Sequence, residues 1–232
     1  MTSLTETMTS AEAAVQLGVG MRQVERLLVA GDITRVGTAG RTALIDAASV
    51  HRLRIRGVRR GRPWACETSY AAIDLLSSGQ TRRLGAVDRS RLLSRLRLMS
   101  AEDVVRATQG RAEVRRYRAS ASFIDQIRQV LLLTGSSAIN SDSDIAMQFG
   151  LAVARRDEVD GYIDMTKVQD LISRAHLIED AQGNVTLRVV DQKQSVGQLV
   201  NAVTVALDLA DSLDSRERSA ALELLRSRKK NL

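Results

Sequence analysis

The chain has 232 residues, of which 44% are hydrophobic, 26% charged and 3% aromatic, and its formal net charge is +7. This composition is typical of a globular protein, and so few aromatic residues argue against stacking of unpaired bases, the usual mode of single-strand binders. A single cysteine, Cys66, excludes an internal disulfide and a cysteine-rich zinc site. We expect a cytoplasmic protein, since no stretch reaches the roughly 20 apolar residues of a membrane span and the start lacks a signal-peptide pattern.

The positive charge is concentrated in the N-terminal half. Residues 1–118 contain 21 basic and 11 acidic residues, a difference of +10, whereas residues 119–232 contain 13 basic and 16 acidic residues, a difference of −3. All the basic residues of the first half are arginines, a bias that a GC-rich genome would also produce. The excess itself favours contact between the N-terminal half and nucleic-acid phosphates.

Residues 10–30 show the pattern of two short helices separated by a tight turn. The first helix covers residues 10–17, where Ser10 is placed to cap the first turn. The second covers residues 21–30, and its apolar residues recur at helical spacing on one inward face: Val24, Leu27 and Leu28. Two helices joined by a short turn that contains glycine form the helix-turn-helix arrangement.

Two short strands and a third helix follow. Residues 33–36 and 42–45 alternate as strands do, and the glycines within residues 37–41 indicate a turn between them. Asp46 is placed to cap a helix that continues to Arg54. The pattern therefore predicts a hairpin wing beside the helix-turn-helix.

Four elements of this segment carry a family resemblance: Glu12-Ala13-Ala14, Leu17-Gly18-Val19, the stretch from Val24 to Leu28 with Gly31-Asp32, and the hairpin from Val36 to Ile45. In these elements the segment resembles the excisionase and MerR-like winged helix-turn-helix family. The resemblance implies that the second helix and the wing contact DNA. The chain departs from the family at Gly20, where Ser or Thr usually caps the second helix.

The predicted DNA-contacting residues come from three places. The second helix supplies Met21, Arg22, Gln23 and Arg26, and the wing supplies Arg35 and Arg41. The third place is the most basic run of the chain, with Arg52, Arg54, Arg56, Arg59, Arg60 and Arg62. This run is either a solvated linker or an arm on the DNA backbone, and its position directly after the wing favours the arm. Gly61 and Pro63 mark a module boundary.

The remaining chain is predicted to hold two further modules. Residues 61–110 form a helical module, and residues 111–232 form an α+β domain that binds a partner or oligomerises. The expected helices are 67–77, 87–99, 104–108, 122–129, 196–209 and 216–226, with one more that follows residues 161–164 and runs through Val168, Leu171 and Ile172. The expected strands are 113–118, 130–133 and 151–154, with a hairpin of 177–180 and 185–190. The predicted fold class is therefore α+β, mainly helical, with a winged helix-turn-helix at residues 1–60.

The C-terminal half carries a second resemblance, in Gly161-Tyr162-Ile163, the run from Asn184 to Val190, and the run from Ala206 to Ser212 with Arg216 and Ala220. In these residues it is similar to the C-terminal parts of AbiE-type antitoxins of bacterial toxin–antitoxin systems. The resemblance implies an antitoxin that represses its own promoter and neutralises a nucleotidyltransferase-like toxin.

Catalytic chemistry is poorly supported by the sequence. His51 and His176 are the only histidines, and neither they nor Cys66 stand in a nucleophile motif. Asp142 and Asp144 suggest a calcium loop, but the required glycine and distal glutamate are missing, so a capped helix start is the better interpretation. We expect no enzyme, no metal and no cofactor.

Three hypotheses remain open at this point: a homodimeric transcriptional repressor of duplex DNA, an autorepressing antitoxin, and an excisionase-like recombination accessory protein. The length of the chain argues against the last, because the excisionase-like module covers only residues 10–55. In the last two helices, Val200, Val203, Leu207, Leu222 and Leu225 either complete a core or form a surface for self-association or a toxin.

Overall fold

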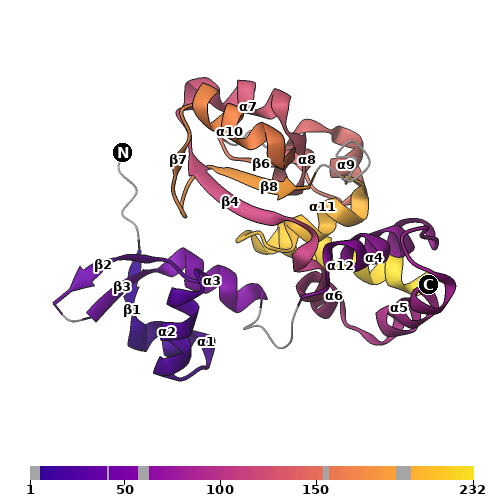
Figure 1. Cartoon of the computed structure of the whole chain (residues 1–232), viewed down its shortest axis with the longest axis horizontal. Coiled ribbons are helices and arrows are strands. Elements are labelled where there is room, and N and C mark those ends of the chain that lie inside the picture. The colour runs from indigo at the N-terminus through magenta and orange to yellow at the C-terminus, as the bar shows by residue number, and fades with distance from the viewer. Residues whose placement is uncertain (1–5, 41, 57–62, 154–156, 192–199) are drawn as a thin grey trace. The chain divides into compact units, whose positions relative to one another are not determined.

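The chain folds into two compact units, Met1–Gly61 and Arg62–Leu232 (Figure 1). The computed structural model describes residues 6–40, 42–56, 63–153, 157–191 and 200–232. Helices and strands are mixed and the strands form two sheets, so the predicted α+β class is confirmed. Within the described residues, no helix combines the length and apolar character needed to cross a membrane.

The N-terminal unit packs three helices around a small antiparallel sheet. Its elements are β1 (Thr7–Thr9), α1 (Ser10–Leu17), α2 (Met21–Val29), β2 (Arg35–Ala39), β3 (Thr42–Asp46) and α3 (Ala47–Arg56), and the strand order is β1-β3-β2. The core gathers apolar side chains from all three helices and β3, among them Val24, Leu27, Ile45 and Val50. Strand β1 was not predicted, because three residues are too few to show an alternating pattern.

Thr9, and not the predicted Ser10, caps α1. The Thr9 hydroxyl accepts a hydrogen bond from the Glu12 backbone N–H at 3.3 Å, and the Glu12 carboxylate accepts one from the Thr9 N–H at 2.7 Å. The Thr9 hydroxyl also donates to this carboxylate at 2.9 Å, and the bonds that the carboxylate accepts from the Thr9 backbone and hydroxyl lower the pKa of Glu12. The reciprocal pair is a capping box, which satisfies two amides that a helix start otherwise leaves open.

The C-terminal unit contains a five-stranded mixed sheet surrounded by helices. Its elements are α4 (Cys66–Ser78), α5 (Ala86–Leu98), α6 (Ala101–Ala107), η1 (Thr108–Arg111), β4 (Glu113–Arg118), η2 (Ala121–Phe123), α7 (Ile124–Val130), β5 (Leu132–Leu133), α8 (Gly135–Ser141), α9 (Ser143–Gln148), β6 (Val159–Asp164), α10 (Met165–Arg174), β7 (Ile178–Glu179), β8 (Val185–Val190), α11 (Ala202–Leu209) and α12 (Ser215–Lys230). The strand order is β5-β6-β8-β4-β7, and only β6 and β8 are parallel.

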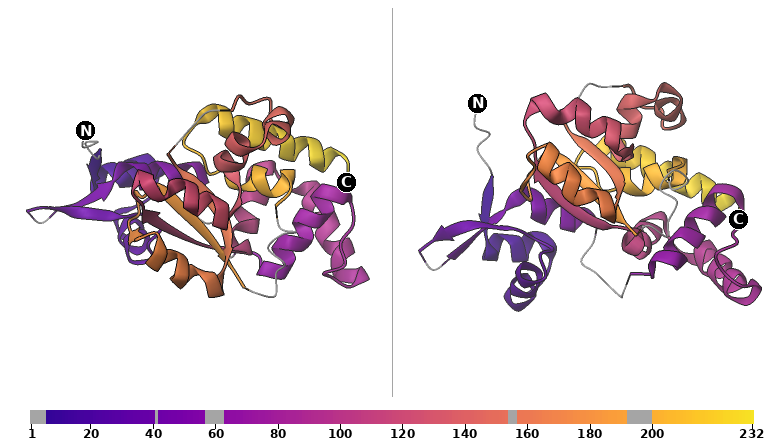
Figure 2. Two further views of the ribbon diagram at one scale, coloured as in Figure 1. Left: turned by 90° about the horizontal axis from the view of Figure 1, so that it is seen from above. Right: turned by 45° about the horizontal axis from the view of Figure 1, so that its top comes forward.

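The two faces of this sheet meet different surroundings. On β8, Val185, Leu187 and Val189 pack into an apolar core with α7 and α10, which lie along one face (Figures 1 and 2). The alternate residue Arg188 points to the other face, where a second core contains α4, α5, α11 and α12. The alternation of side chains along a strand thus separates a purely apolar layer from one that contains charge.

A buried network of charges joins the sheet to the helical core. Asp208 of α11 pairs with Arg111 of η1 and, at 2.8 Å, with Arg188 of β8. Arg188 also makes two bonds of 2.8 and 2.7 Å to the carboxylate of Asp160 on β6. The Arg111 Nε donates to the Tyr162 hydroxyl at 3.1 Å. Buried charges are tolerated when each has partners of this kind.

The network and the helical core explain why residues 61–110 are not a module of their own. Helices α4, α5 and α6 share one core with α11 and α12, and residues 62–232 form a single compact unit in place of the two expected modules. Helix α11 is buried on every side from Val203 to Leu209. Val203 and Leu207 therefore complete the core and do not form an association surface.

Three predictions for the C-terminal half are wrong in detail. Strand β7 pairs with β4 and not with β8, because both edges of β8 are already occupied by β4 and β6. Residues 151–153 form no strand, and the strand expected at 130–133 is limited to Leu132 and Leu133, since Val130 ends α7. Helix α8 was not predicted, and α9 was predicted only by the cap at its start, because their short polar sequences show no helical periodicity.

Replacing Asp208 with Asn should lower the free energy of unfolding of the C-terminal unit by about 3–5 kcal/mol, because it leaves Arg111 and Arg188 without their shared carboxylate. Urea unfolding followed by Trp64 fluorescence measures this loss, since Trp64 lies in the helical core. As a control, Asp170→Asn removes a solvent-exposed pair with Arg174 and should cost less than about 1 kcal/mol. Equal losses of unfolding free energy in Asp208→Asn and Asp170→Asn would contradict the role of Asp208 as the shared buried partner of Arg111 and Arg188.

Candidate nucleic-acid interface

Helix α2 of the N-terminal unit has one buried face and one exposed face. Val24 and Leu27 are buried in the core, whereas Arg22 and Arg26 are exposed on the other side of the helix. No hydrogen bond or ion pair between described residues holds these two guanidinium groups. Met21, with 47% of its surface exposed, lies at the start of the same helix. The predicted base-reading residues therefore share one accessible helix, with Gln23 half-buried beside them.

The turn between α1 and α2 has a fixed backbone geometry. Gly18 adopts a left-handed conformation with φ 64°, and the Val19 N–H donates to the Ala14 carbonyl oxygen at 3.0 Å. Val19 packs against the core. Gly20 precedes α2 without a side chain to cap it, and nothing lies within 4 Å of the place where its Cβ would be. The N-terminus of α2 is therefore open to an anionic group.

The hairpin β2–β3 presents a further exposed basic residue. Arg35 is exposed at the start of β2, next to an irregular register between Arg35 and Gly37. Strand β2 continues to Ala39, beyond the predicted residues 33–36, so the connection to β3 is shorter than the five-residue turn we expected. Gly40 in this connection has φ 61°, and Arg41 lies outside the described residues.

The arginines of the basic run after the hairpin have different surroundings in the structure. Arg52 is turned inward, where its guanidinium binds the buried carboxylate of Asp46 at 3.3 Å with only 14% of the side chain exposed. Asp46 also accepts hydrogen bonds from the first amides of α3, as predicted. Arg52 thus stabilises the start of α3, while Arg54 remains exposed beside His51. The side chain of Arg56 and the whole of Arg59, Arg60 and Arg62 lie outside the described residues.

The residues considered for catalysis or metal binding lie in ordinary structural environments. Asp142 accepts hydrogen bonds from two backbone N–H groups at the start of α9, so the interpretation as a helix cap is confirmed. Burial raises the pKa of the Cys66 thiol, which disfavours a reactive thiolate. His176 packs edge-on against Phe123 with ring centroids 5.5 Å apart. Among the described residues, no three His, Cys, Asp or Glu side chains are grouped as metal ligands.

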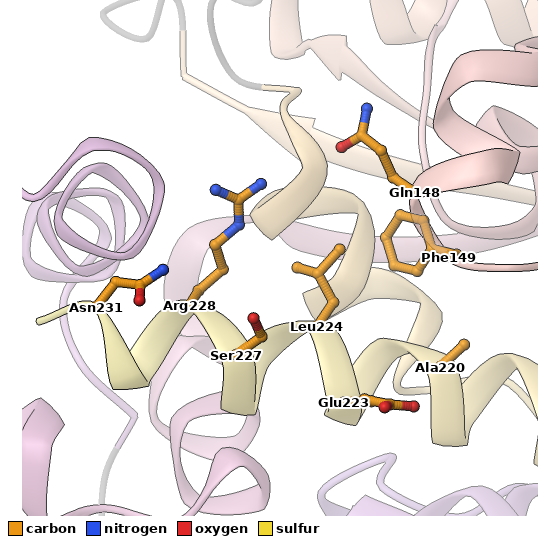
Figure 3. Close-up of a pocket in the computed structure, with 8 residues that line it drawn as sticks. All are labelled: Gln148, Phe149, Ala220, Glu223, Leu224, Ser227, Arg228 and Asn231. Carbon is orange, nitrogen blue, oxygen red and sulfur yellow. The ribbon is translucent and has the colours of Figure 1, made fainter.

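A hollow of about 380 Å³ lies on the C-terminal unit between α9 and α12 (Figure 3). Phe149 and Leu224 supply apolar lining, and Arg228 and Asn231 supply polar groups. The sequence did not indicate this hollow, because only the capped start of α9 was predicted and the lining residues are about 75 positions apart. It contains none of the predicted DNA-contacting residues.

Comparison with known proteins identifies no relative. No family model matches the chain, and neither a curated protein nor a solved structure matches it.

Replacing Thr9 with Ala should destabilise the N-terminal unit by about 1 kcal/mol, since it removes the capping hydroxyl of α1. Residues 1–61 contain no Trp, Tyr or Phe, so fluorescence does not monitor this unit. Hydrogen exchange of the α1 backbone amides, measured in the full chain, monitors its stability instead. Ser10→Ala is the matched control and should change protection by only a few tenths of a kcal/mol. A larger loss of protection in Ser10→Ala than in Thr9→Ala would show that Ser10 is the cap.

Proposed function

We propose that this chain is a sequence-specific regulator of transcription that binds duplex DNA through a winged helix-turn-helix in its N-terminal unit. The observation that carries the proposal is the exposed pair Arg22 and Arg26 on α2, opposite the buried Val24 and Leu27. In this proposal α2 is the recognition helix, α1 supports it across a glycine-containing turn, and the hairpin β2–β3 is the wing.

The chemistry of α2 suits the major groove. The groove is about 12 Å wide and admits one helix, so side chains on the exposed face would reach base edges. Arginine donates two hydrogen bonds to guanine, and glutamine pairs in the same way with adenine, so Arg22, Arg26 and Gln23 are the residues that would select the sequence. The open N-terminus of α2 suits a backbone phosphate, and Arg35 in the wing suits a neighbouring one.

The size of α2 supports binding as a dimer. Its nine residues span about 13 Å at 1.5 Å per residue, so one copy reads only a few base pairs. Two copies bound to half-sites about 34 Å apart would read enough sequence for a useful operator. We therefore expect a palindromic or directly repeated site in the promoter that the protein controls.

The variant Arg22→Ala/Arg26→Ala should lower the preference for the operator over random DNA by roughly 1–3 kcal/mol for each arginine that reads a guanine. Quantitative gel shifts with both DNAs at several salt concentrations measure this preference. The matched control, Arg118→Ala/Arg174→Ala, removes two exposed arginines from β4 and α10 and should leave the preference unchanged.

Two results would contradict the proposal. The first is a folded full chain that binds no duplex DNA at low salt, where phosphate contacts are strongest. The second is a variant at Arg22 and Arg26 that weakens operator and random DNA equally, since that outcome would make the two arginines phosphate contacts only.

A further inference from the structure

A second group of exposed basic residues lies on the C-terminal unit. It combines exposed arginines of α5 with the basic end of α12, and one hydrogen bond between these segments joins residues 135 positions apart. We define the α5–α12 surface by its basic members: Arg89, Arg91, Arg95, Arg97, Arg226, Lys229 and Lys230.

Hydrogen bonds hold the two segments together. The Arg97 Nε donates to the Leu232 carbonyl oxygen at 3.0 Å, and the Lys229 ammonium donates to the Met99 carbonyl oxygen just after α5. Arg226 binds Glu102 at the start of α6 at 2.6 Å. The end of α12 therefore lies beside the end of α5, as the position of the C-terminus in Figure 2 shows.

This surface has a larger excess of positive charge than the C-terminal unit as a whole. Residues 62–232 contain 25 basic and 22 acidic residues, which nearly balance. Helix α5 contains four arginines and one acidic residue, Asp88, and α12 from Leu222 to Lys230 contains four basic residues and one acidic residue, Glu223. The C-terminal dipole of each helix offsets only about half a charge. A clear positive excess therefore remains.

The arginines of α5 are exposed yet partly ordered. The Arg95 guanidinium stacks over the Trp64 ring at 5.1 Å from its centroid. Arg91 has 78% of its side chain exposed, and its contact with Asp88 at 3.5 Å is of the weak surface kind. Leu92 and Leu96 are buried in the core, and the exposed large apolar residues of α5 are Val87 and Leu98 at its two ends, so this helix has no continuous apolar stripe left to insert into a lipid surface.

We infer that the α5–α12 surface binds the phosphate backbone of duplex DNA, as a contact independent of sequence that adds to the contacts of α2. Guanidinium groups pair with phosphate oxygens through two parallel hydrogen bonds, so each exposed arginine offers a site for one phosphate of this polymer. The inference rests on the proposed function, because DNA held by the N-terminal unit is presented to the second surface at high effective concentration.

The test compares two triple variants of the full chain, each of which removes three positive charges. Arg89→Gln/Arg91→Gln/Lys230→Gln alters the α5–α12 surface, and Arg118→Gln/Arg174→Gln/Arg216→Gln alters exposed residues of β4, α10 and the other end of α12. Binding to operator and to random duplex is measured across a salt series. Each lost phosphate contact reduces the slope of log affinity against log salt by about 0.9.

The surface variant should lose up to about 2.7 in slope on both DNAs, while the control keeps the slope of the original chain. Equal slopes in the two variants would overturn the inference and leave the proposed function intact if Arg22 and Arg26 still set the preference for the operator. Absence of all DNA binding would overturn both. Single-stranded RNA that displaces the duplex from the original chain but not from the surface variant would also overturn the inference, because the surface would then be an RNA site.

Discussion

The carboxylate of Asp208 is the point at which the parts of the C-terminal unit are joined. It pairs with Arg111 at the end of the first group of helices and with Arg188 in the sheet, and Thr134 donates to it at 2.7 Å. A carboxylate placed this deeply requires its partners in fixed positions, because an unsatisfied buried charge is far more costly than a lost surface pair. The network thus fixes which face of the sheet meets the core of α4, α5, α11 and α12, and it fixes where η1 ends.

The local structure of the N-terminal unit was accessible from sequence because its determinants are local. Val24 and Leu27 recur at helical spacing, and Asp46 precedes a helix that its side chain caps. The first compact unit ends at Gly61, two residues before the only proline of the chain, Pro63. The cap of α1 was misplaced by one residue, since Thr9 and Ser10 are chemically equivalent candidates.

The buried network was not predictable, because its members look ordinary in the sequence. Asp208 only interrupts an otherwise apolar stretch, and Arg111 is one of many arginines in a basic half. The same ambiguity affected the candidate site. Nothing local distinguishes Arg52, which binds Asp46, from Arg54, which is exposed, until the helix and its cap are placed in three dimensions. The α5–α12 surface depends on proximity between segments at opposite ends of a unit.

The long separation between Arg111 and Asp208 affects the order in which the two units can fold while the chain is synthesised on the ribosome. Every core element of the N-terminal unit lies within the first 61 residues, so this unit can fold soon after it is synthesised. The C-terminal unit must wait for α11 and α12, because the Arg111–Asp208 pair spans 97 residues and closes a core begun by α4. During that interval the first helices of the second unit would leave their apolar faces uncovered, a period in which a nascent chain is most exposed to chaperones and proteases.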